Sequence, residues 1–342
     1  MRPAERPEAR ARAGRPTRAV VLSTIGAIIA GGFVAVQTSA NGHVSVMTGS
    51  SVLAVAINHG SGLLIGILAS LAIGAFPRAW RSLRARRSEI RWWWFLGGFM
   101  GFAAMMGIVI STPELGVVMV AVAITLGQLG GSVLADSAAL GPGGRRPLST
   151  LRIVGIGVAI IAIAVGATGH LHPGNLVFIP LVVIAGVIVA IQQAANGWIL
   201  VVTGGEWAVM TVINFILSTL ATGTALLIVM GIDPPDFSAL PWWAPLGGTV
   251  GVIVGIVIAV TVKTIGVLSS MLCIAAGQAI ASILADLIVP VDALGVTTSS
   301  VVGAVLAVLA VGLAGLGSVR RAPVPERAAR VEGPEPGERH AD

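Results

Sequence analysis

The sequence predicts an all-α integral membrane protein with ten transmembrane helices, arranged as two inverted-topology repeats of five helices each. Three observations predict this fold class: a very apolar composition, ten apolar runs of membrane-spanning length, and an internal repeat. Of the 342 residues, 55% are apolar and only 11% are charged, and the mean hydropathy is +0.93. This composition excludes a soluble enzyme and a disordered chain. A single cysteine, Cys273, excludes an internal disulfide framework.

The apolar runs have close to the roughly 20 residues that a helix needs to cross a hydrocarbon core about 30 Å thick. They lie approximately at Arg18–Ser39, Val52–Phe76, Trp92–Ser111, Leu115–Ala138, Leu151–Ala167, Leu176–Ala195, Trp207–Met230, Trp243–Val262, Ile265–Ile288 and Val296–Gly317. Strands are not expected, because the runs are too long and lack the alternation of polar and apolar residues that a membrane barrel requires.

The basic residues predict the orientation. If the N-terminus is cytoplasmic, all 21 lysines and arginines fall in segments on the cytoplasmic side. They include a basic tail at residues 1–17 and six arginines between positions 78 and 91. The positive-inside rule therefore predicts a multi-pass protein of a bacterial-type inner membrane with both termini cytoplasmic, and residues 319–342 are expected to form a disordered cytoplasmic tail. The pI near 11.3 is then a topological signal and does not indicate nucleic-acid binding.

The second half of the chain, residues 174–318, repeats the first, residues 18–168. At a spacing of 155 positions, Gln37, Asn41, Gly42, Thr48 and Gly49 match Gln192, Asn196, Gly197, Thr203 and Gly204. At a spacing of 150, Trp92, Trp93, Gly97, Gly98, Gly101, Gly116, Gly127, Gln128, Ser132, Leu134, Ala135 and Asp136 match Trp242, Trp243, Gly247, Gly248, Gly251, Gly266, Gly277, Gln278, Ser282, Leu284, Ala285 and Asp286. Because each copy holds five spans, an odd number, the second copy is expected to enter the membrane from the opposite side.

These motifs carry a resemblance to a known family. Each copy has a Gln-x3-Asn element ending its first helix and a Gly-Gln-x3-Ser-x-Leu-x-Asp stretch in its fourth, and Arg-Arg-Pro-Leu at 145–148 precedes the fifth helix of the first copy alone. The sequence resembles the YdcZ-type branch of the drug/metabolite transporter superfamily over about residues 18–318, in a form that fuses two five-helix units. The resemblance implies a ten-helix bundle with a central cavity between its halves. It also implies a plasma-membrane carrier that works by alternating access, without naming a substrate.

Polar side chains inside the spans are the candidates for a binding site, because they are costly in hydrocarbon. Gln128 and Gln278 occupy matching positions of the fourth and ninth spans. One interpretation places both amides at a midplane substrate site, and the other uses each amide to join its helix to a neighbour.

Three further amides recur in each copy. They are Gln37, Asn41 and Asn58 in the first copy and Gln192, Asn196 and Asn214 in the second. A spacing of four places each Gln-x3-Asn pair on one helix face. The pairs are expected near helix ends, either at the rim of a cavity or as caps before Gly42 and Gly197.

Few ionisable groups lie inside the spans. Glu114, at the outer start of the fourth span, and His59, in the second, are the candidates for proton coupling. Asp136 and Asp286 fall about 30 Å along their helices and are expected at the far interface, in contact with solvent.

The predicted function is secondary transport of small metabolites or drugs across the plasma membrane. The expected partners are a small-molecule substrate and the lipid bilayer, with a homodimer left open. No cofactor, metal site or enzymatic activity is expected, because the chain has no Walker lysine loop, no cluster of metal ligands and no catalytic triad. The alternatives are a non-transport membrane protein, such as a channel or assembly subunit, and an intramembrane lipid-modifying enzyme.

Overall fold

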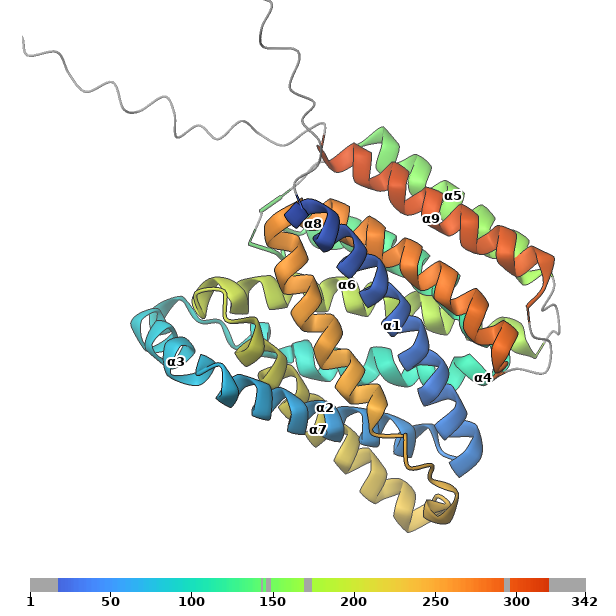
Figure 1. Ribbon diagram of the computed structural model, residues 1–342, viewed down its shortest axis with the longest axis horizontal. Coiled ribbons are helices and arrows are strands. Elements are labelled where there is room, and N and C mark those ends of the chain that lie inside the picture. The colour runs from blue at the N-terminus through green and yellow to red at the C-terminus, as the bar shows by residue number, and fades with distance from the viewer. Residues whose placement is uncertain (1–17, 143, 146–148, 169–173, 292–295, 320–342) are drawn as a thin grey trace, which may run out of the picture.

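The computed structural model describes residues 18–142, 144–145, 149–168, 174–291 and 296–319, and the regular secondary structure in these ranges is helical (Figure 1). The helices are α1 (Arg18–Thr48), α2 (Ser51–Ala72), α3 (Ala75–Ala85), α4 (Gly97–Ser137), α5 (Thr150–Ala167), α6 (Phe178–Val202), α7 (Trp207–Ile232), α8 (Leu246–Ile288) and α9 (Thr298–Val319). Short 3-10 helices lie at Arg87–Glu89 (η2), Trp92–Leu96 (η3), Asn175–Val177 (η4) and Phe237–Ala239 (η5). The all-helical part of the predicted fold class is confirmed within these ranges.

Six helical segments of the described chain are long and apolar enough to cross a membrane. They are Arg18–Thr48, Ser51–Ala72, Trp92–Ser137, Thr150–Ala167, Asn175–Val202 and Trp207–Ile232. Large apolar side chains such as Leu22, Leu64 and Leu227 are exposed on these helices. Lipid would cover such side chains in a bilayer, so the exposed apolar surface agrees with a membrane protein.

The third and fourth predicted spans form one element, α4, which bends sharply at Gly116. Gly116 has φ 72° and ψ 164°, a conformation that glycine adopts without the clash of a Cβ. Before the bend, Gly97 accepts a hydrogen bond from Gln192 of α6 at 2.7 Å. Beyond the second arm, Leu140 accepts a hydrogen bond from Trp198 of the same helix at 2.8 Å. Both ends of α4 therefore reach the same part of α6, and the chain reverses direction at Gly116.

The eighth and ninth predicted spans likewise form one element, α8, along α1. A Cβ on Gly251, near the start of α8, would lie 3.2 Å from Nε2 of Gln37. Val291, just beyond the end of α8, would contact a Cβ on Gly42 at 3.1 Å. Both ends of α8 thus lie beside the C-terminal half of α1, and Figure 1 shows the two arms of α8 meeting at a turn.

The most extensive helix contacts join the two halves of the chain. They pair α1 with α8, α4 with α6, α5 with α9, and α2 with α7. Each pair takes one element from residues 18–168 and one from residues 174–319. The two halves are therefore interleaved, and the space between them is walled by both.

The close approach of α4 to α6 depends on Gly127. A Cβ at this position would lie 2.0 Å from the carbonyl oxygen of Val183, so one helix would have to move. Gly127→Ala is expected to lower the free energy of unfolding by about 1–3 kcal/mol, the usual cost of overpacking. Gly130→Ala on the same arm is the matched control, because a Cβ there meets no atom within 4 Å. Thermal unfolding in detergent measures both variants, and a wild-type melting temperature for Gly127→Ala would contradict this packing.

Candidate functional site

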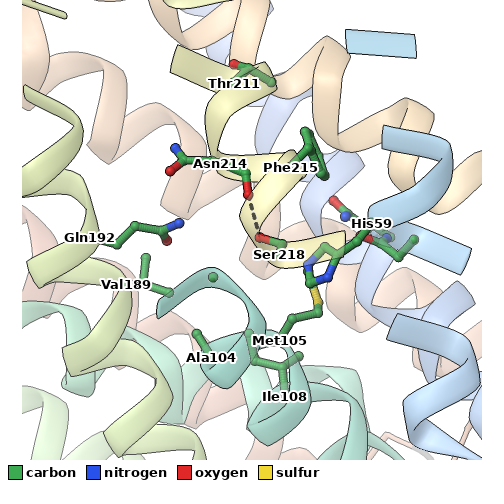
Figure 2. Close-up of a pocket in the computed structure, with 13 residues that line it drawn as sticks. His59, Ala104, Met105, Ile108, Val189, Gln192, Thr211, Asn214, Phe215 and Ser218 are labelled. Carbon is green, nitrogen blue, oxygen red and sulfur yellow. Dashed lines mark hydrogen bonds between the residues drawn. The ribbon is translucent and has the colours of Figure 1, made fainter. Parts of the chain in front are cut away.

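A cavity of about 220 Å³ lies between α1, α2, α4, α6 and α7 (Figure 2). Its walls come from both halves of the chain. The lining residues are Gln37, Asn58, His59, Gly101, Ala104, Met105, Ile108, Val189, Gln192, Thr211, Asn214, Phe215 and Ser218. None of these thirteen residues is an aspartate, glutamate, lysine or arginine. The cavity therefore offers hydrogen bonds, aromatic surface and thioether surface, without a fixed charge.

Four of the amides that the repeat singled out line this cavity. Gln37 and Gln192 are separated by the repeat spacing of 155 positions. Asn58 and Asn214 are separated by 156 positions, one more than this spacing. The structure thus brings together side chains that lie more than 150 positions apart in the sequence.

The two asparagines are held by the same interaction in each half. Asn58 donates from Nδ2 to Oδ1 of Asn41 at 3.3 Å, and Asn214 donates from Nδ2 to Oδ1 of Asn196 at 2.8 Å. Asn41 and Asn196 are both buried and stand behind the cavity wall. Their role in the structure is therefore to orient Asn58 and Asn214.

This arrangement leaves two buried acceptors without a partner. Among the described residues, neither Oδ1 of Asn58 nor Oδ1 of Asn214 accepts a hydrogen bond. Asn58 is only 1% exposed, so solvent does not compensate for the missing bond. Buried polar atoms of this kind are uncommon in native proteins and call for an explanation, such as a bound ligand or water.

Gln37 and Gln192 differ in how much of their hydrogen-bonding capacity the protein uses. Gln192 donates to the carbonyl oxygen of Gly97 at 2.7 Å and so holds the start of α4. For half-buried Gln37 the structure describes no hydrogen bond within the described part of the chain. The amide of Gln37 is therefore the one most available to a ligand.

His59 contributes an aromatic, ionisable group to the cavity wall. Its Nδ1 lies 2.8 Å from Oγ1 of Thr222, whose own proton goes to the carbonyl oxygen of Ser218. Thr222 therefore accepts from His59, which leaves Nε2 of the neutral ring as an acceptor. Phe215 packs edge-on against the His59 ring, with centroids 6.1 Å apart. Figure 2 shows His59, Phe215 and Ser218 on one side of the cavity and Gln192 on the other.

The expectation that the Gln-x3-Asn elements lie near helix ends is wrong. Helix α1 continues through Asn41 and Gly42 to Thr48, and α6 continues through Asn196 and Gly197 to Val202. Glycine can end a helix, but inside a membrane helix it also permits close packing. Gly42 packs closely against Thr112. The capping interpretation is therefore excluded for both pairs.

Gln128 and Gln278 do not meet in a common cavity. Gln128 is exposed on α4, whereas half-buried Gln278 lines a separate space of about 10 Å³. The residue before each glutamine forms the close helix contact: Gly127 with α6 and Gly277 with α1. Successive helical residues point about 100° apart, so each glutamine is turned away from that contact. The interpretation that places both amides at one midplane site is therefore wrong.

Asp286 stabilises the fold and does not contact solvent as the sequence predicts. It is 3% exposed, and its carboxylate accepts the backbone N–H groups of Val117 at 3.0 Å and Val118 at 2.8 Å. These groups begin the second arm of α4, where a helix N-terminus favours a negative charge. Its counterpart Asp136 instead forms an ion pair with Arg152 at 2.6 Å. The expected solvent contact is therefore wrong for Asp286.

Glu114 stands apart from the cavity. Its backbone oxygen accepts a hydrogen bond from Asn175 at 2.9 Å, and its side chain is not part of the cavity wall. Of the two coupling candidates, the structure thus places only His59 in the cavity. Within the described residues there is no group of three or more His, Cys, Asp or Glu side chains that could hold a metal ion.

Comparisons with known proteins agree with this architecture. A solved structure entitled "Crystal structure of protein" is similar over 87% of this chain and 97% of its own, with a TM-score of 0.54 and 18% identity. That similarity concerns the fold alone. No curated protein matches the chain.

The family comparison identifies the chain more closely. The profile of the family described as "Putative inner membrane exporter, YdcZ" matches residues 22–165 and again residues 177–313. The two matches coincide with the two halves of the internal repeat. With its apolar helices, this makes the chain a multi-pass inner-membrane protein of a transporter family rather than of an enzyme family. The chain belongs to the YdcZ family of drug/metabolite transporters and carries two copies of the family's unit.

Proposed function

We propose that this protein is a secondary transporter that moves small metabolites or drugs across the inner membrane by alternating access. The observation that carries the proposal is one cavity lined by matched amides from both halves: Gln37 with Gln192, and Asn58 with Asn214. A site at the boundary of two halves is exposed to one side and then the other when the halves rock against each other. The cavity is the proposed substrate site.

The proposal includes ten membrane crossings and an inverted repeat. Support comes from α4 and α8, which both double back along a partner helix. If each arm of these two elements is one crossing, they supply four, and α1, α2, α5, α6, α7 and α9 supply the other six. This even number agrees with both termini on the cytoplasmic side, as the basic residues predict.

The cavity wall favours an uncharged substrate. A charged solute would lose its hydration inside the protein and find no fixed counter-charge among the thirteen lining residues. The volume of 220 Å³ corresponds to about seven water molecules at about 30 Å³ each, so the substrate is small. Asn58 and Asn214 line this wall, and a reorientation of either amide would present its unpaired oxygen to a solute with hydrogen-bond donors. Met105 and Phe215 would cover its apolar part.

Counterflow in proteoliposomes tests the transport function. A thermal-shift screen of uncharged metabolites on the purified protein first identifies a ligand, because binding to the folded state raises the melting temperature. Vesicles loaded with this ligand are then expected to take up labelled ligand transiently and saturably, faster than empty vesicles. Flux that neither saturates nor responds to internal ligand would indicate a channel. Binding without any protein-dependent flux would contradict transport altogether.

A further inference from the structure

A group of exposed arginines and tryptophans lies outside the transport site, on the segment after α2. We call it the basic corner, and its residues are Trp80, Arg81, Arg84, Arg87, Arg91 and Trp92. Figure 1 shows α3 beyond the end of α2, at an edge of the bundle. The side chains of all six residues are exposed.

Helix α3 has one face that packs on the protein and one that does not. Ala75 and Ala79 are buried against Ala208 and Val209 of α7. Positions on the other side of the helix carry three exposed residues of the basic corner: Arg81, Arg84 and Trp80, which is 66% exposed. The other three, Arg87, Arg91 and Trp92, follow the end of α3. Exposed arginine and tryptophan side chains beside the end of a membrane helix are typical of the membrane–water interface.

Two arginines of the same segment bind other parts of the fold and are not part of the corner, whereas Arg81 of the corner donates only within α3, to the carbonyl oxygen of Pro77 at 3.2 Å. Arg78 forms a two-point ion pair with Glu206, with Nε to Oε1 at 2.5 Å and Nη2 to Oε2 at 3.2 Å, and this hydrogen bonding raises the pKa of Arg78. Arg86 donates to the carbonyl oxygen of Val201 at 3.0 Å. These contacts hold α3 against the start of α7 and the end of α6. The four arginines of the corner take no part in holding α3 against α6 and α7. Their positive charge is little neutralised nearby, because Glu89 is the only acidic residue between positions 78 and 92.

The second copy builds the equivalent place without arginine. Residues 233–241 precede Trp242 and Trp243 as residues 73–91 precede Trp92 and Trp93, yet they contain no lysine or arginine. Trp242 is 86% exposed and Trp92 is 75% exposed, so the exposed tryptophan is common to both copies. In the proposed topology the arginines lie on the cytoplasmic side and the matching segment of the second copy on the other side, as the positive-inside rule expects. The cytoplasmic side is also where basic side chains meet the anionic lipid headgroups of the inner leaflet.

We propose that the basic corner binds the phosphate groups of anionic phospholipids in the surrounding bilayer. The planar guanidinium group donates two parallel hydrogen bonds to phosphate oxygens, and indole rings prefer the headgroup level of a membrane. Each arginine near an anionic bilayer surface raises affinity about five-fold. Four arginines flanked by two exposed tryptophans thus form a site for a lipid with negative charge in its headgroup.

Brominated lipids test this proposal directly, because bromine quenches the fluorescence of nearby tryptophans. The purified protein in neutral detergent is titrated with brominated phosphatidylglycerol and, separately, with brominated phosphatidylcholine. The wild type is expected to be quenched at much lower concentrations of phosphatidylglycerol, and 0.5 M salt is expected to reduce this preference. The triple variant Arg84→Gln, Arg87→Gln, Arg91→Gln is expected to need roughly a hundredfold more phosphatidylglycerol. Its response to phosphatidylcholine and its melting temperature should stay at wild-type values.

Two further arms identify the source of the effect. The triple variant Arg10→Gln, Arg12→Gln, Arg15→Gln removes the same charge elsewhere and is expected to bind phosphatidylglycerol like the wild type. Equal losses in the two triple variants, or no preference of the wild type for the anionic lipid, would refute the site. Millimolar inorganic phosphate is expected to leave quenching unchanged. If phosphate displaces the lipid, the corner binds a soluble anion and the lipid proposal fails.

Discussion

Gln37→Leu is expected to weaken ligand binding by a few-fold to tenfold while the melting temperature stays near that of the wild type. Gln37 lines the cavity, and the described part of the chain provides no hydrogen bond to its amide. Its removal therefore takes a hydrogen-bond partner from the ligand and none from the rest of the protein. A lost hydrogen bond lowers the binding free energy by about 0.5–1.5 kcal/mol. Titration of the ligand by calorimetry, together with thermal unfolding, measures both quantities.

Gln192→Leu is the matched variant in the other copy. It also removes the hydrogen bond to Gly97, so both ligand affinity and the melting temperature are expected to fall. This difference between two repeat-related glutamines separates binding from packing. Normal binding combined with a lower melting temperature in Gln37→Leu would make Gln37 a packing residue and place the substrate elsewhere.

Asp286→Ala is expected to lower the free energy of unfolding by about 3–5 kcal/mol, because it removes a buried charge that two backbone N–H groups require. The unpaired groups would be those of Val117 and Val118, immediately after the bend at Gly116. Asp286→Asn is expected to lose less stability, since an amide oxygen still accepts a hydrogen bond. Chemical or thermal unfolding in detergent measures the series.

Asp136→Ala provides the control within the same repeat. Asp136 is paired with Arg152, and its side chain is 25% exposed, so the loss is expected to stay within about 1 kcal/mol. Similar losses for Asp136→Ala and Asp286→Ala would show that the cap at Gly116 contributes little.

Much of the fold follows from sequence because membrane helices are constrained so strongly. Apolar runs predict helices, since every backbone group inside the hydrocarbon needs an internal partner. The repeat also indicates the cavity amides, because polar side chains that recur at similar depths in apolar helices are costly unless they are used. Gln37 and Gln192 recur at the same register, and Asn58 and Asn214 within one position of it.

Other features depend on three-dimensional contacts that no local pattern encodes. The N–H groups that Asp286 binds lie 168 and 169 positions away in the sequence. The direction of Gln128 depends on which face of α4 meets α6, which spacing alone does not determine. Gly42 has the same sequence context whether it ends a helix or packs inside one. The repeat also pairs Gln128 with Gln278, although the glycine before each packs against a different helix, Gly127 against α6 and Gly277 against α1.

A substrate that occupies the cavity between the two halves should protect a cysteine placed in the cavity wall from labelling. Cys273 is the only native cysteine, so Cys273→Ser gives a background in which Met105→Cys reports on the cavity and Gln128→Cys on the exposed face of α4. The rate of maleimide labelling is measured with and without the ligand identified in the thermal-shift screen. The ligand is expected to slow labelling at position 105 and leave labelling at position 128 unchanged. Protection at position 128 with none at position 105 would contradict the cavity as the substrate site.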